Sequence, residues 1–170
     1  YKAIRYPFID PGEGYEGNLW DWDSYFTARA LLILGKKYGE DCMTKAGIPL
    51  KKAELHAKGC ALNFLSAECP DGYVPVMMTG DGDFCEFFVR EHMRGVKVNQ
   101  MKPFLCQAIL NACEFSGDYE WFDKEKALKY LEYYETHQRD EETGLFFWQD
   151  DIMIGIDNNP TVFFRPPRTC

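Results

Sequence analysis

Apolar residues recur at helical spacing in four stretches of the chain, so the sequence predicts a mainly helical protein. The most regular stretch is 51–65. Its expected buried face consists of Ala57, Cys60, Ala61, Phe64 and Leu65. Gly59 lies inside this stretch, where a glycine often marks a point of close packing.

The first and third helices are predicted from similar stripes. The first is expected to begin near Asp21, Asp23 and Ser24, because acidic and hydroxyl side chains favour a first helical turn, and to end at Gly35 and Gly39. Its apolar side is expected to be Phe26, Ala30, Ile33 and Leu34. Pro103 suits the first position of the third helix. The stripe of that helix is Leu105, Ile109, Ala112 and Cys113.

A fourth helix is predicted after the break at Gly117. Asp118 is expected to be its cap. The residues that repeat at helical spacing are Trp121, Ala127, Leu128, Leu131 and Tyr134. A polar turn at 139–144 follows, and it ends in Glu142-Thr143-Gly144.

Residues 73–89 have β character, which predicts a short β-hairpin or a long decorated loop between the second and third helices. Asp81 and Asp83 lie at its acidic tip. The spacing of a calcium-binding EF-hand loop is absent, so a solvated turn is the favoured interpretation.

Composition narrows the class of ligand. The 170 residues suffice for one domain with a core, and the hydrophobic fraction of 46% indicates a globular chain. A net charge of −8 argues against nucleic acid and anionic membranes as binding partners but permits a neutral or cationic ligand.

No apolar run approaches the roughly 20 residues that are needed to span a membrane. The chain starts at Tyr1 rather than Met, so we expect a trimmed sequence.

The cysteines indicate thiols rather than metal ligands. There are seven, an odd number, and no pair has C-x-x-C spacing, so we expect no zinc site and no cofactor. Cys60, Cys106 and Cys113 fall in predicted helices, where a reduced, buried thiol is the ordinary state. Unpaired cysteines favour a cytoplasmic location.

Many aromatic residues fall in predicted loops. They are Tyr6, Phe8, Tyr15, Trp20, Trp22, Phe146, Phe147 and Trp148. Flat ring faces on loops can stack on sugar rings, and they can also simply hold long loops in place.

The strongest candidate for chemistry is the loop at 151–160. An apolar run, 145–148, leads into Asp150 and Asp151, and then into Asp157 between Gly155 and Pro160. A lone carboxylate among apolar residues has a raised pKa, as a general acid requires. The alternative is that Asp157 caps a helix or turns a loop. Asp150 and Asp151 are expected to be solvated loop acids.

Three segments in this order, 20–26, 99–104 and, after the turn at 142–144, 155–159, resemble the (α/α)6-barrel inverting glycoside hydrolases, which include trehalases, processing α-glucosidases and mannosylglycerate hydrolases. The family's W-D-S segment matches Trp22-Asp23-Ser24. Its Q-x-x-P helix start matches 100–103, and its G-x-D segment, which carries the general acid, matches 155–158. Asn159 stands where the family often has serine, which is a mild departure.

The resemblance implies a fold of helical hairpins from an (α/α)6 toroid, with the active site on the loop face. It covers nearly the whole chain but only about the N-terminal half of the family's catalytic domain. Residues 1–170 would then be a single partial barrel. A missing C-terminal half or a second chain would complete it and supply the catalytic base.

The resemblance also implies roles for individual residues. Asp157 would be the general acid, while Trp22 and Asp23 would hold the sugar by stacking and by accepting hydrogen bonds from hydroxyl groups. The other expected sugar contacts are Gln100, Lys102, Trp148 and Asn158. The plain alternative for Asp23 is a helix-start acid.

Three functions therefore compete. The first is hydrolysis of an α-linked glucoside or related oligosaccharide with inversion. The second is a non-catalytic helical toroid that binds glycan or a partner protein, which the absence of a second matching carboxylate favours. The third is a sugar epimerase or lyase, but His56, His92 and His137 lie in no motif and the charge balance is acidic.

Overall fold

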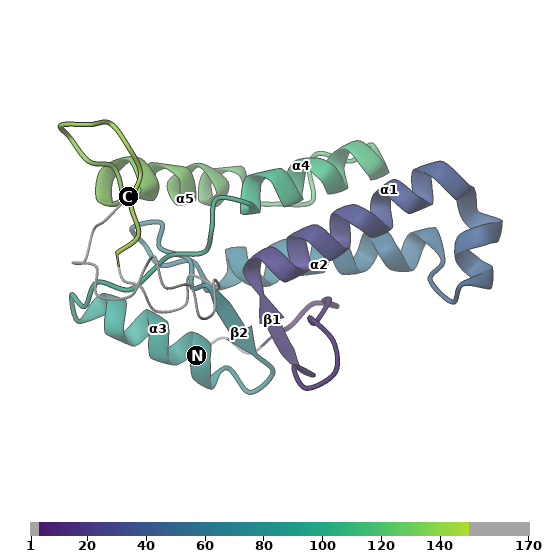
Figure 1. Ribbon diagram of the computed structural model, residues 1–170, viewed down its shortest axis with the longest axis horizontal. Helices are drawn as coiled ribbons and strands as arrows, with labels where there is room; N and C mark the ends of the chain where they lie inside the picture. Colours follow the sequence, from purple (N-terminus) through teal and green to yellow (C-terminus); the bar gives the residue numbers. More distant parts are fainter. Residues whose placement is uncertain (1–3, 150–170) are drawn as a thin grey trace.

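The computed structural model describes residues 4–149, and this part of the chain is mainly helical with one small antiparallel sheet (Figure 1). The elements in chain order are β1 (Asn18–Trp20), α1 (Asp21–Lys45), α2 (Leu50–Ala67), β2 (Met77–Thr79), α3 (Asp83–Met93), α4 (Leu105–Ser116) and α5 (Lys124–His137). The prediction of a mainly helical protein is confirmed.

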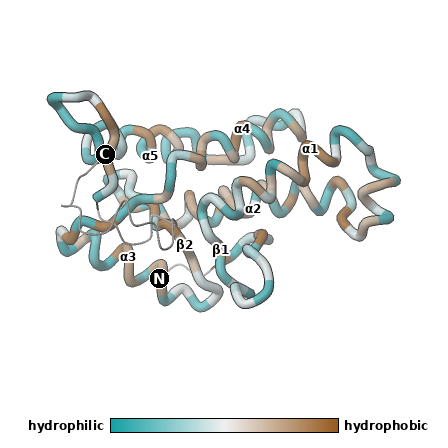
Figure 2. The backbone as a smooth tube through the Cα atoms, in the orientation of Figure 1, coloured by the Kyte–Doolittle hydropathy of each residue, from teal (hydrophilic) through white to brown (hydrophobic). Residues whose placement is uncertain are grey.

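The long helices α1 and α2 lie side by side, and α4 packs against both (Figure 1). Helix α5 continues beyond α4 along the same side of the molecule, while α3 and the sheet lie on the other side (Figure 1). Apolar and polar residues alternate along these helices (Figure 2). The main core lies between α2, α4, α5 and the loops that join them.

The apolar faces predicted for α2 and α4 are confirmed, because every residue of both stripes is buried. Gly59 is a point of close packing, as expected. A Cβ atom at this position would lie 1.8 Å from the backbone oxygen of Pro7. The N-terminal segment therefore crosses α2 where only glycine leaves room for it.

Helix α1 differs from its prediction in length and in its buried face. It continues past Gly35 and across a kink at Gly39, whose φ is 74°, before it ends at Lys45. The predicted apolar side was wrong, because all four residues are exposed. The buried positions instead include Tyr25, Ala28 and Leu32.

The β-hairpin predicted at 73–89 is also wrong. Only the three residues of β2 form a strand, and they pair with β1 in the register Asn18↔Thr79. The aromatic run that follows is helix α3. Its buried residues Cys85, Phe88 and Val89 fall at i, i+3 and i+4, the spacing of a helix with one buried face.

Helix α5 begins later than predicted and has a different cap. Asp123 accepts hydrogen bonds from the backbone N–H groups of Glu125 and Lys126. Asp118 instead accepts from the N–H of Glu120 in the preceding turn. Of the predicted stripe, Ala127 and Tyr134 are buried, whereas Leu128 and Leu131 are exposed. Pro103 lies ahead of the first turn of α4, where Phe104 is the cap residue.

The cysteines at 42, 60, 69, 85, 106 and 113 are free thiols. Burial raises the pKa of the Cys60 thiol to about 12 and that of Cys106 to about 11, so both are protonated and inert at neutral pH. Between residues 4 and 149, no helix has the length and apolar character needed to span a membrane.

Candidate functional site

The first turn of α1 meets the loop before α4 at a buried ion pair. The ammonium nitrogen Nζ of Lys102 lies 3.0 Å from Oδ1 of Asp21 and 3.1 Å from Oδ2. The backbone N–H of Lys102 also donates to Oδ2, at 2.9 Å. Asp21 is wholly buried, and the two residues are 81 positions apart in the sequence. These bonds join two of the three segments that carry the resemblance.

Burial and pairing act on Asp21 in opposite directions. Burial raises the pKa of its carboxyl group, and the Lys102 ammonium and the surrounding hydrogen bonds lower it. Burial prevails, so the pKa lies above its usual range. At this buried position the Lys102 ammonium and the hydrogen bonds, rather than solvent, stabilise the charged form of the carboxyl group.

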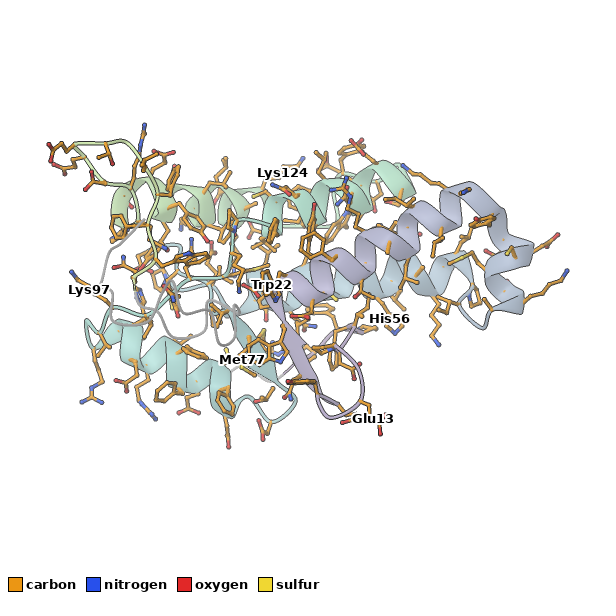
Figure 3. The ribbon with its side chains drawn as sticks, in the orientation of Figure 1. Glu13, Trp22, His56, Met77, Lys97 and Lys124 are labelled. Carbon is orange, nitrogen blue, oxygen red and sulfur yellow. The ribbon has the colours of Figure 1, made fainter. Side chains whose placement is uncertain are left out.

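The indole ring of Trp22 lies beside the same ammonium group. The distance from Lys102 Nζ to the centre of the ring is 4.7 Å, within the range of a cation–π interaction. Trp22 is half-buried at the start of α1, near the middle of the molecule (Figure 3). Trp22 thus keeps part of its surface available to a ligand.

Asp23 follows Trp22 and has different surroundings from Asp21. It is half-buried. Its side chain forms no hydrogen bond or ion pair with any residue between 4 and 149. A half-buried carboxylate with no polar partner in the described part of the chain can accept hydrogen bonds from a hydroxylated ligand.

A second set of contacts also joins α1 to the loop before α4. The rings of Tyr25 and Phe104 are stacked, with centres 4.7 Å apart and planes 6° from parallel. Phe26 packs edge-on against Phe104. The Tyr25 hydroxyl donates to Gln107 Oε1 at 3.1 Å. The two segments therefore form one packed unit.

Gln100 is fully buried and supports this loop. Its amide oxygen accepts from the backbone N–H of Val74, at 3.2 Å, and its amide nitrogen donates to the backbone oxygen of Tyr130, at 3.2 Å. The structure gives Gln100 a supporting position, and its expected contact with a sugar stays untested. Lys102 is likewise engaged with Asp21 and nearly inaccessible, its side chain being 6% exposed.

The chain that leads towards the third segment is tied to the second. The backbone N–H of Gln149 donates to Oδ1 of Asn99 at 2.8 Å. Phe147 exchanges two hydrogen bonds with Gln138 at the end of α5, at 2.9 Å and 3.0 Å. These bonds hold Phe147 and Gln149 against the end of α5 and the loop before α4.

Trp148 lies in the wall of a hollow with a volume of about 490 Å³, and its expected contact with a sugar stays untested. The other lining residues are Pro103, Leu131, Tyr134, Glu135, Gln138, Phe146 and Phe147. Pro103 directly follows Lys102, so the hollow adjoins the loop that holds the ion pair. Its walls are mostly apolar and aromatic.

Two predicted site residues, Asp157 and Asn158, lie outside the described residues. Asp21 was not predicted as part of the site, because an acid in a first helical turn already has an ordinary explanation. Nothing in the sequence marks Lys102, which comes from a distant loop, as the partner of Asp21.

In the range 4–149, no three histidine, cysteine or acidic side chains are grouped to hold a metal ion.

Comparison of the chain with protein-family models, with curated proteins and with solved structures gave no match.

Proposed function

We propose that this chain is part of a glycoside hydrolase that cleaves an α-linked glucoside or related oligosaccharide with inversion. The observation that carries the proposal is the contact between the first and second segments, which are distant in the sequence. The first and second are joined by Asp21 and Lys102, and the chain entering the third is bonded to the second through Asn99 and Gln149. Segments distant in sequence that meet around aromatic rings are what a composite sugar site requires.

In this proposal the sugar ring stacks on Trp22, and Asp23 accepts hydrogen bonds from its hydroxyl groups. Both side chains are half-buried, and among residues 4–149 the Asp23 side chain has no polar partner that would compete with a sugar. Gln100 and Lys102 support the loop behind this surface. Trp148 and Asn158 would contribute on the side of the third segment.

Asp157 donates the proton to the glycosidic oxygen in the proposed reaction. A second carboxylate, supplied from outside this chain segment, removes a proton from the water that attacks the anomeric carbon. The bond to the leaving group breaks as the new bond forms on the opposite face, so the configuration inverts. An inverting pair stands roughly 6.5–9.5 Å apart to admit this water.

Exposed apolar side chains support the further proposal that the helices belong to an incomplete (α/α)6 toroid. On α1 they are Phe26, Ile33 and Leu34, on α4 Leu110, and on α5 Leu128 and Leu131. These side chains offer apolar surface on three helices against which further helices could pack. Further helices of a toroid would cover it.

The test is hydrolysis of trehalose and maltose by the full-length protein that contains these residues, followed by proton NMR of the released glucose. We expect trehalose to release α- and β-glucose in equal amounts, and maltose to release the glucose of its non-reducing end as the β anomer, because only the unit that water attacks is inverted. Asp157→Asn should lower kcat by about 100-fold to 10,000-fold, the usual contribution of a general acid. Asp151→Asn, which changes a nearby acid, should leave turnover close to normal.

Several outcomes would contradict the proposal. Release of both glucose units of trehalose as the α anomer would exclude inversion, and near-normal turnover by Asp157→Asn would remove the general acid. Binding of either sugar without hydrolysis would favour the non-catalytic glycan-binding module. The absence of both binding and hydrolysis would reject a saccharide site for these ligands.

A further inference from the structure

We propose that Asp21 and Lys102 form a positioning pair that fixes the Trp22 ring as the stacking platform of the site. Asp21 is the positioning residue, acting through Lys102. The role of the ring as a sugar platform rests on the proposed function, whereas its fixation by the ion pair does not.

The burial of the pair indicates a task other than stability. Removing two charges from water costs several kcal/mol per ion, and apolar residues of similar volume often stabilise a protein as well or better. An acid in the first turn of α1 could complement the helix dipole from the surface, without loss of solvent, yet Asp21 is 0% exposed.

A charged pair has a directional geometry that an apolar contact lacks. The ammonium group of Lys102 engages both oxygens of the Asp21 carboxylate and still lies 4.7 Å from the centre of the Trp22 ring. The carboxylate also accepts the backbone N–H of Trp22 itself, at 2.7 Å. Asp21 thus holds Trp22 both through its backbone and through the cation beside its ring.

The cation cannot follow the ring if the ring moves, because the backbone around Lys102 is fixed. The hydroxyl of Tyr130 donates to the backbone oxygen of Lys102 at 2.6 Å, and the hydroxyl of Tyr134 donates to that of Met101. Both tyrosines come from α5 and are buried. The position of the ring is therefore set by α1, the loop before α4, and α5 together.

The first arm of the test observes the ring directly, without any ligand. The chain has four tryptophans, so labelling with 5-fluorotryptophan gives four fluorine NMR signals, of which Trp22→Phe identifies one. In the double variant Asp21→Asn/Lys102→Met both charges are removed, while the single asparagine oxygen can still accept one of the two backbone N–H groups that the carboxylate binds. We expect the Trp22 signal to shift and broaden. An unchanged signal would overturn the proposal.

A matched control exists elsewhere on the protein. Lys58 lies 5.6 Å from the centre of the Trp121 ring and pairs with Asp118, which is half exposed. The double variant Lys58→Met/Asp118→Asn should move the Trp121 signal and leave that of Trp22 in place.

Should Asp21→Asn/Lys102→Met fail to fold, the variant Lys102→Arg keeps the charge but relocates the cation. Lys102→Arg must then move the Trp22 signal, and an unchanged signal would again overturn the proposal.

The second arm measures binding of trehalose and maltose by titration calorimetry. We expect the affinity of Asp21→Asn/Lys102→Met to fall at least about tenfold while its melting temperature stays within a few degrees of the wild type. Unchanged affinity together with a displaced Trp22 signal would overturn the platform role. If the wild type binds neither sugar, the proposed function fails for these ligands and the fluorine signals alone decide whether the pair fixes the ring.

Discussion

Asp21 and Asp23 stand two residues apart in one helical turn, yet their surroundings differ completely. Asp21 is buried and bonded to Lys102, whereas the half-buried Asp23 side chain bonds to nothing between residues 4 and 149. The sequence could place both acids in a first turn, because that position suits them. It could not assign their separate tasks, because the partner of Asp21 comes from 81 positions along the chain.

Another acid, Asp71, offers a prediction at the same scale. Its Oδ2 lies 2.7 Å from Nε2 of His92, whose ring stacks on Tyr73. Burial raises the pKa of the Asp71 carboxyl, but the hydrogen bonds from His92 and from the N–H of Tyr73 outweigh it, so the pKa is lowered. The charged form of Asp71 is therefore the one that the fold favours.

Asp71→Asn should destabilise the protein by about 0.5 kcal/mol near pH 5, the scale of a partly exposed ion pair. A lowered folded-state pKa gives stability that is present above the unfolded pKa of about 3.9 and is lost as the pH falls through the folded value. The cost of the substitution should therefore shrink as the pH falls below the unfolded pKa. Urea unfolding at several pH values measures it, with Glu13→Gln on an exposed loop as control. A cost that grows on acidification would contradict the assignment.

At the scale of the element, the helices α2 and α4 could be predicted because their buried faces are regular and almost wholly apolar, with Asn63 of α2 as the polar exception. Helix α1 could be located but not oriented. Its buried positions include Asp21 and Ser24, while Phe26, Ile33 and Leu34 are exposed. A rule that places apolar residues inside therefore selects the wrong face.

Helix α3 could not be distinguished from a strand, because its short aromatic run suits both structures. The signals that decide for a helix are local. Gly82 adopts a left-handed conformation before the first turn, and Asp83 and Glu86 occupy that turn. Cys85, Phe88 and Val89 then share one face.

The cap of α5 could not be chosen from the sequence either. Asp118 and Asp123 both precede the helix, and only the backbone geometry shows that Asp123 is the cap.

The crossing at Gly59 carries the prediction for this scale. Gly59→Ala would place a Cβ atom 1.8 Å from the backbone oxygen of Pro7, so the N-terminal segment must move away from α2. We expect a loss of about 2–3 kcal/mol in the free energy of unfolding, the upper range for overpacking. Chemical denaturation measures the loss.

The control for this prediction is Gly80→Ala. A Cβ atom there would meet only the backbone oxygen of Gly17, at 3.8 Å, and the φ of Gly80 lies outside the left-handed region. The control should change stability little. Equal effects of the two substitutions would show that the crossing is not tight.

At the scale of the whole molecule, three sequence segments were expected to meet, and two of them do so within residues 4–149. The ion pair and the stacked rings of Tyr25 and Phe104 join them. The bond between Asn99 and Gln149 ties in the chain before the third. Asp157 lies beyond the described residues, so its role as a general acid remains a prediction from the resemblance.

The central claim is that the first turn of α1 binds a saccharide through Trp22 and Asp23. Titration calorimetry of the full-length protein with trehalose and maltose, wild type against Asp23→Ala, tests it most directly. Loss of hydrogen bonds to a charged group costs about 1.5–3 kcal/mol, so the account predicts affinity at least about tenfold weaker in a variant that remains folded. Equal affinity of the two proteins would contradict it.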